Sequence, residues 1–165
     1  MNSNISDNQN LIIRKGEIND LPEMRHLFTG TIDEICKKDY DPQQLDAWKS
    51  GAENEERWMN VISNQFVLIA VSDGQMAGFC TLDKGNYIDL LFVHKNYQHK
   101  GIASLLYSLI EQEALQHHEK QLMAEVSKTA RPFFEKIGFQ VVTEQTVNVK
   151  GIAMTNYKMI KHLIS

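Results

Sequence analysis

Residues 87–103 read Tyr87-Ile-Asp-Leu-Leu-Phe-Val-His-Lys-Asn-Tyr-Gln-His-Lys-Gly-Ile-Ala103. Their first seven residues are nearly continuous in apolar side chains, as in a strand covered on both faces. After Gly101, apolar residues recur at positions 102, 105, 106, 109, 110 and 114, a spacing that only a helix places on one face. The segment therefore predicts a central strand, a short loop and a long helix.

The loop before this helix has the features of an anion site. A helix begins with unpaired backbone N–H groups and about half a positive charge, which attract phosphate. Gly101 lets the backbone approach a ligand closely, Ala103 keeps the first turn small and Lys100 adds a cation. These residues suit a diphosphate, although a plain strand-to-helix connector has the same pattern.

Other phosphate and metal motifs are missing from the chain. The order Lys100-Gly101 reverses that of the P-loop, and no G-x-G-x-x-G follows the strand. His118-Glu119 lacks the second histidine of H-E-x-x-H, and Cys36 and Cys80 have no metal-ligand spacing. We expect no metal site and two buried free thiols.

Two motifs then resemble a known family. Gln98-His-Lys-Gly-Ile-Ala103 matches the Q/R-x-x-G-x-G/A signature of the Gcn5-related N-acetyltransferases (GNAT), and Ser127-Lys-Thr-Ala-Arg-Pro-Phe-Phe-Glu-Lys-Ile-Gly-Phe139 resembles their second signature. The resemblance covers nearly the whole chain after residue 10, and residues 40–48 are similar to a branch of small uncharacterised bacterial members. It implies an α/β (α+β) fold with a mixed, largely antiparallel central sheet and helices on both faces.

The resemblance also implies a binding site for acetyl-CoA as cosubstrate. Backbone groups of Leu91, Phe92 and Val93 would hold the pantetheine arm where two strands splay. Ser127 and Phe134 would line the thiol end. The pyrophosphate would lie on the loop formed by Gln98, His99, Lys100, Gly101, Ile102 and Ala103.

Catalysis needs a base, because roughly one lysine-like amine in 2,500 is neutral at pH 7, a handicap of about 4.6 kcal/mol. Asp89 on the central strand is the first candidate and Glu125 the second, each with a structural ion pair as its alternative. His94 is a weaker third. Many family members carry a tyrosine proton donor where this chain has Phe134, so general acid catalysis at that position is in doubt.

The flanking sequence predicts further elements. Residues 11–14 form a first strand, and Asp20 with Glu23 resembles a capping box at the start of a helix. Two more helical stretches begin near 41 and 54. Strands are expected at 66–71 and 76–82, paired antiparallel, and at 122–126, 139–143 and 153–159, with a short helix at 129–136. We expect 153–159 to be an edge strand that can pair between subunits.

Composition predicts the setting. A chain of 165 residues suits one domain, here residues 11–165 after a polar tail at 1–10. The net charge of −4 disfavours nucleic acid. Without an apolar run long enough for a bilayer or a secretion signal, we expect a cytoplasmic protein with no membrane partner.

The leading hypothesis is an N-acetyltransferase that moves an acetyl group from acetyl-CoA to a primary amine of a small molecule or peptide, by direct attack in a ternary complex. The alternatives are a non-catalytic acyl-CoA-binding sensor or interaction module and a plain structural domain. The acidic composition mildly favours cationic acceptors. The sequence names neither the acceptor nor the acyl chain length, and it leaves a homodimer open.

Overall fold

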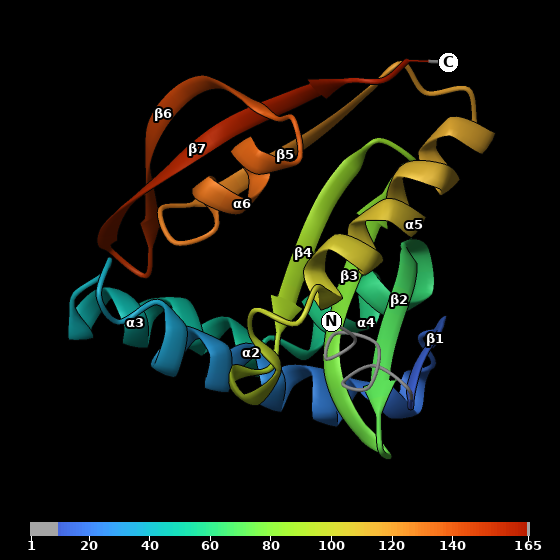
Figure 1. Cartoon of the computed structure of the whole chain (residues 1–165). Helices are drawn as coiled ribbons and strands as arrows, with labels where there is room; N and C mark the ends of the chain where they lie inside the picture. The colour runs from blue at the N-terminus through green and yellow to red at the C-terminus, as the bar shows by residue number, and fades with distance from the viewer. Residues whose placement is uncertain (1–9, 165) are drawn as a thin grey trace, which may run out of the picture.

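The computed structural model describes residues 10–164, so the predicted tail lies outside the described residues except for Asn10 (Figure 1). Within this range the strands form one mixed sheet in the order β1-β2-β3-β4-β5-β7-β6. Only β4 and β5 run parallel, which confirms the largely antiparallel sheet. The strands are β1 Leu11–Lys15, β2 Phe66–Ser72, β3 Gln75–Asp83, β4 Tyr87–Val93, β5 Gln121–Ser127, β6 Gln140–Val149 and β7 Ile152–His162.

Helices cover both faces of this sheet, as predicted. One buried cluster joins α2, α3 and α4 to one face, and a second joins α5 and α6 to the other. The α-helices are α2 Leu21–Ile35, α3 Pro42–Lys49, α4 Glu55–Asn64, α5 Ile102–Gln116 and α6 Arg131–Lys136. Short 3-10 helices are η1 Ile18–Asp20, η2 Ser50–Glu53 and η3 Lys95–Tyr97. None of the helices in the described range is long and apolar enough to cross a bilayer.

β4 occupies the middle of the sheet, as its apolar sequence predicted. Leu90 packs into the cluster with α2 and α4, while Ile88 and Val93 pack into the cluster with α5. The prediction for α5 also holds, with one difference in its buried face: Tyr107 is buried and Leu105 is 39% exposed. The helix is therefore rotated slightly relative to the face expected from spacing alone.

The start of α2 differs from the predicted capping box. Asp20 does not cap α2 with its side chain; its carboxylate instead binds the Arg14 guanidinium at 2.7 and 2.8 Å and the Glu17 N–H at 2.7 Å. The capping box is formed one turn earlier, between Glu17 and Asp20. The hydrogen bond from the Arg14 guanidinium is the main reason that the pKa of the Asp20 carboxyl is lowered. The Asp20 carboxylate, which the sequence predicted would cap α2, therefore binds a cation of β1 instead.

The prediction that residues 153–159 form an edge strand is wrong. They lie in β7, which pairs with β5 on one side and β6 on the other. The reason is that β6 and β7 form a long hairpin whose second strand returns into the sheet, leaving β6 outside. In the described part of the chain the sheet therefore ends at β1 and β6, and Val142 of β6 is 63% exposed.

Gly30, in the middle of α2, offers a stability prediction. A Cβ added there would meet no other atom of the described residues within 4 Å, apart from the helix backbone and its chain neighbours. Alanine is favoured over glycine in a helix by about 0.5–1 kcal/mol. We therefore expect Gly30→Ala to raise the free energy of unfolding by about that amount, measured by urea denaturation. A loss of stability would contradict this reading of α2.

Candidate functional site

A cleft opens where β4 and β5 separate. These strands pair only at Tyr87↔Met123 and Ile88↔Ala124, after which they diverge (Figure 1). Each keeps its outer neighbour, β3 or β7, so only the space between them is left unpaired. The described residues enclose here a cleft of about 1310 Å³, larger than the 300–1,000 Å³ of common small-molecule sites. It has room for two substrates.

Backbone groups of β4 point into this cleft in alternation. The His94 N–H bonds the Ala77 carbonyl, so in an antiparallel ladder Phe92 also directs its N–H and C=O toward β3. The backbone N–H and C=O groups of Leu91 and Val93 point away from β3, toward the space left where β5 has separated from β4. The Val93 carbonyl already accepts hydrogen bonds from Thr31 and Gln98, at 3.0 and 2.7 Å. The backbone of Leu91 and the N–H of Val93 are therefore the groups best placed to hold a ligand.

The loop before α5 forms one end of the cleft. Gly101 is the residue before the helix and has φ 81°, and His99 has φ 61°, so the chain turns through two left-handed residues. Such turns direct successive backbone N–H groups to one side, and the helix dipole adds positive charge. A Cβ on Gly101 would meet no atom of the described residues within 4 Å, apart from its chain neighbours. This loop is a suitable cradle for a phosphate group.

Most of the predicted binding residues come together around the cleft, and two do not. Ile102 is buried in the core, at 2% exposure, and the Lys100 ammonium lies 5.8 Å from the centre of the Tyr97 ring. Neither side chain lines the cleft formed by residues 10–164. The residues that do line it are Leu91, Phe92, Val93, Gln98, His99, Gly101, Ala103, Ser127 and Phe134.

The second predicted motif, residues 127–139, supplies a turn and an apolar surface to the cleft rather than polar groups. The Ser127 hydroxyl accepts a hydrogen bond from the Ala130 N–H at 3.1 Å, which stabilises the turn into α6. Phe134 is buried and packs edge-on against Phe133 and Phe139. Its ring closes the cleft with an apolar surface.

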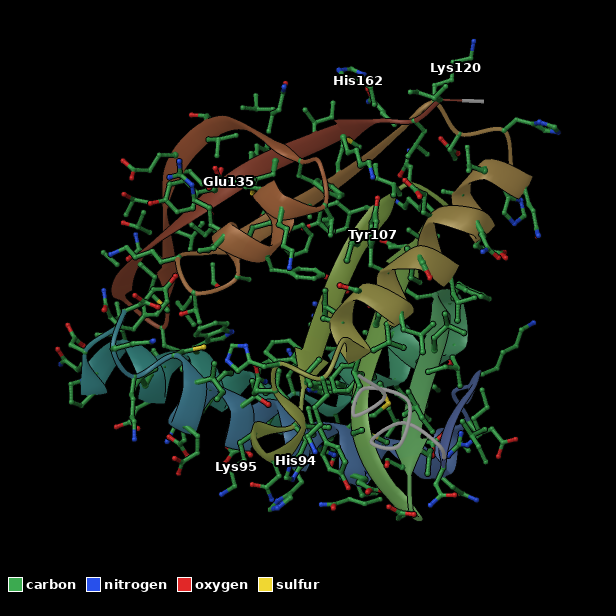
Figure 2. All side chains as sticks on the ribbon, viewed as in Figure 1. His94, Lys95, Tyr107, Lys120, Glu135 and His162 are labelled. Carbon is green, nitrogen blue, oxygen red and sulfur yellow. The ribbon has the colours of Figure 1, made fainter. Side chains whose placement is uncertain are left out.

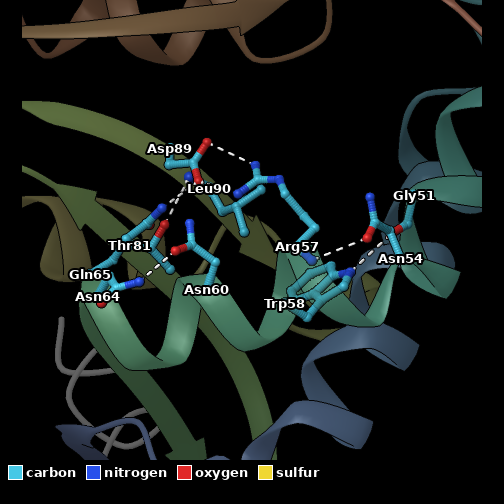
Figure 3. A network of polar contacts seen from close by, with 10 residues as sticks. All are labelled: Gly51, Asn54, Arg57, Trp58, Asn60, Asn64, Gln65, Thr81, Asp89 and Leu90. Atoms are coloured by element: carbon cyan, nitrogen blue, oxygen red, sulfur yellow. Dashed lines mark hydrogen bonds and ion pairs between the residues drawn. The ribbon is translucent and has the colours of Figure 1, made fainter.

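Asp89 is held in a network of polar contacts (Figure 3). Its two carboxylate oxygens accept from both terminal nitrogens of Arg57, at 2.7 and 2.9 Å, and from the Gln65 amide at 2.8 Å. The side chain of Asp89 is 13% exposed. Its position coincides with a shift in the β3–β4 register, where Leu82 pairs with Ile88 but Thr81 with Leu90. The structural ion pair foreseen as the alternative for Asp89 is therefore present.

Glu125 lies across the cleft from Asp89 and differs from it in environment. It is exposed and lines the cleft, and within residues 10–164 no hydrogen bond or ion pair engages its carboxylate. Its neighbour is Tyr87 on β4, whose pKa is raised to about 12, first by burial and then by the Glu125 charge. The cleft thus holds an unengaged carboxylate beside a neutral phenol.

Neither His94, the third candidate base, nor Tyr107 of α5 is among the residues that line the cleft; both are labelled in Figure 2. The His94 Nδ1 accepts a hydrogen bond from the Asn96 N–H at 3.0 Å, and burial lowers the pKa of the His94 imidazole. Tyr107 donates to Glu111 at 3.0 Å and packs edge-on against Phe139. Tyr107 is therefore a packing residue, and His94 shapes the turn after β4.

Sequence reasoning gave no role to Arg57, Tyr40 or Asn156, which the structure places at the cleft. The buried Tyr40 hydroxyl accepts from the Lys128 N–H and donates to the Thr155 carbonyl, both at 2.9 Å, and so joins the end of α2 to β5 and β7. The Asn156 side-chain oxygen is buried with no hydrogen-bond partner in the described range. A ligand N–H would satisfy it. No local sequence pattern marks these residues, because their partners are distant in the chain.

Comparisons with known proteins show the family of this chain. A model described as an acetyltransferase (GNAT) domain matches residues 36–161. The chain is 34% identical over 151 residues to an uncharacterized N-acetyltransferase of Escherichia coli (strain K12), YafP, covering 91% of this chain and 95% of that protein.

Solved structures give the same result. A GCN5-related N-acetyltransferase from Rhodopseudomonas palustris is 29% identical with a TM-score of 0.89, covering 92% of this chain and 95% of that one. The PaiA N-acetyltransferase of Thermoplasma acidophilum, solved in complex with coenzyme A, is 21% identical with a TM-score of 0.77, covering 93% and 99%. The latter likeness concerns the fold alone.

Proposed function

The chain belongs to the GNAT acetyltransferase family, whose members use acyl-CoA, and we propose that it transfers an acetyl group from acetyl-CoA to a primary amine of a small molecule or peptide. The observation that carries this proposal is the separation of β4 from β5 after two residue pairs, next to the open N-terminus of α5. The separated strands supply backbone groups that can bind the extended pantetheine arm of acetyl-CoA. The N-terminus of α5 suits the diphosphate of the same molecule.

In this proposal the residues act on acetyl-CoA as follows. The loop from Gln98 to Ala103 holds the pyrophosphate with its backbone N–H groups, and the Gln98 side chain fixes the loop to the end of β4. The Leu91 backbone and the Val93 N–H hold the pantetheine arm. Phe134 excludes water from the thiol end.

Direct attack by the amine is favoured over a covalent acyl-enzyme. The two cysteines of the chain are the natural candidates for such an intermediate, and both are buried. Burial raises the pKa of Cys36 to about 11 and also raises that of Cys80. Because the thiolate is the nucleophile, neither thiol is activated at neutral pH. A ternary complex needs no such group.

We assign the general base to Glu125 rather than to Asp89. The Asp89 carboxylate already accepts three hydrogen bonds, two of them from a guanidinium, and taking up a proton would disrupt them. Glu125 has no competing partner among residues 10–164. No proton donor is needed at Phe134, because a thiol pKa near 8.5 handicaps thiolate departure by only about 2 kcal/mol.

A pair of substitutions at Gly101 tests the cofactor site. Asparagine and aspartate are equal in size and both tolerate a left-handed backbone, so their difference isolates the charge. We expect Gly101→Asp to bind acetyl-CoA about 10- to 100-fold more weakly than Gly101→Asn, as repulsion of about 1.4–2.8 kcal/mol would give. Isothermal calorimetry at low and high salt measures both affinities.

Salt should reduce this difference, because screening weakens the repulsion between exposed charges. Equal affinities for the two variants would show that no phosphate lies at the α5 N-terminus. Tight binding of acetyl-CoA without transfer to any amine would favour the non-catalytic sensor instead.

A further inference from the structure

The cleft crosses the sheet and has two chemically different halves. On the α5 and α6 side it is lined by the phosphate loop and the turn after β5. On the other side it is lined by α2, α3, α4 and the end of the β6–β7 hairpin. If acetyl-CoA occupies the first half, as proposed above, the acceptor amine enters from the second.

One wall of this acceptor half is aromatic. The half-buried Trp48 lies between Tyr40, at 5.4 Å between ring centres, and Phe92, at 6.5 Å. Phe92 in turn contacts Phe28 at 5.0 Å. Trp48 and Phe92 are both only partly buried although they pack against a core, so a ligand in the cleft would cover their remaining surface.

The opposite wall is aliphatic and comes from the β6–β7 hairpin. Val147, Val149 and Met154 line the cleft, and the two valines are half-buried. The hairpin is held near α3 by hydrogen bonds from Tyr40 to the Thr155 carbonyl and from Gln44 to the Ala153 carbonyl, at 2.9 and 3.0 Å. This wall is therefore fixed in place, and the half-site is apolar on two sides.

The charges in this half favour a cation at one end only. Glu125 presents a carboxylate with no hydrogen bond or ion pair in the described range, and Lys158 is its register neighbour on β7. Two cations that line the cleft have other contacts: Arg57 pairs with Asp89, and the Lys128 ammonium lies 5.5 Å from the Tyr40 ring centre. Lys38 and two more acids, Glu34 and Asp39, lie at the rim, and Asp39 accepts from Thr129. An acceptor with a single ammonium group and an apolar body fits this distribution.

We propose that the acceptor is a small primary amine carrying an aromatic or branched apolar group. The ammonium faces Glu125, and the apolar group lies between Trp48 and the hairpin residues Val147 and Met154. Burying a phenyl-sized group favours the bound acceptor by a factor of roughly 10–100. This inference rests on the proposed acetyl transfer and adds the class of substrate to it.

The test compares 2-phenylethylamine and 3-methylbutylamine with ethanolamine and 1,4-diaminobutane. Free CoA thiol released from acetyl-CoA gives kcat/KM for each amine, and calorimetry gives acetyl-CoA binding separately. We expect kcat/KM for the two apolar amines to exceed that for the polar pair by about 10- to 100-fold. This comparison uses the wild-type protein and requires no variant.

Two substitutions on β6 locate the effect. Val147→Asn should reduce the preference for the apolar amines about 10-fold and leave acetyl-CoA binding unchanged. Val142→Asn makes the same change on the same strand at a residue that is 63% exposed and outside the cleft, and should alter neither. An equal loss of preference in both variants would contradict the placement.

The two proposals fail in different ways. Polar amines that match or exceed the apolar ones would overturn the acceptor class alone. No transfer to any amine by a protein that binds acetyl-CoA would overturn the transfer step of the proposed function, and the acceptor class with it. Failure to bind acetyl-CoA at all would overturn the proposed function, and the acceptor class with it.

Discussion

We expect Glu125→Gln to lower kcat/KM for acetyl transfer by about 100- to 1,000-fold at pH 7, the size of effect usual for loss of a general base. Glutamine keeps the size and polarity of the side chain but cannot take a proton from the ammonium. The amine must then lose its proton to water, and few molecules are neutral at this pH. The measurement is the rate of CoA thiol release at saturating acetyl-CoA over a range of pH.

Two further results would support this role. Acetyl-CoA affinity should not change, because Glu125 lies outside the half of the cleft that we propose for acetyl-CoA. Below the pKa of the amine, the fall in kcat/KM toward acid pH should be steeper in the variant, since without the Glu125 carboxylate only the shrinking neutral fraction of the amine can react. At pH values above the pKa of the amine, the variant should approach the wild-type rate.

Asp89→Asn is the matched control. It removes one charge from the pair with Arg57, so we expect a loss of stability of about 1–2 kcal/mol, moderate because Arg57 is 40% exposed. The rate of the chemical step should change much less than in Glu125→Gln. The reverse pattern, with Asp89→Asn inactive and Glu125→Gln active, would assign the base to Asp89.

The second large effect is expected for Gly78→Val, which should lower the free energy of unfolding by about 2–4 kcal/mol. A Cβ at Gly78 would lie 2.9 Å from the Phe92 carbonyl oxygen and 3.4 Å from both Ile102 Cγ2 and Val93 Cα. Two of these atoms belong to the β4 backbone, which cannot move without changing the wall of the cleft. Urea denaturation measures the loss, and weaker acetyl-CoA binding should accompany it.

Gly78→Ala and Gly30→Ala form a matched pair for this prediction. The same chemical change should destabilise by about 1–2 kcal/mol at Gly78, where backbone is in contact, and stabilise at Gly30, where space is open. Equal effects at the two positions would show that β3, β4 and α5 do not pack as closely as described.

Several elements were predictable from sequence because their signals are local. The apolar spacing after Gly101 predicted α5, and the continuous apolar run predicted a central β4. The antiparallel pairing expected for 66–71 and 76–82 is also present, with a turn at Asp73 and Gly74, which both have positive φ. The capping prediction for Asp20 failed because its partner, Arg14, comes from a strand. The edge prediction for 153–159 failed because strand order depends on pairing between distant segments.

Local sequence was therefore sufficient for the strand, loop and helix that we propose hold the pyrophosphate, since periodicity and glycine placement act within a few residues. Only the tertiary structure decided the rest of the site. Arg57 is 32 residues from Asp89, and nothing near either residue shows that they pair, or that the Glu125 carboxylate has no hydrogen bond or ion pair within residues 10–164. The cleft itself exists because β4 and β5 separate, and that separation reflects the packing of whole layers, which no short stretch of sequence encodes.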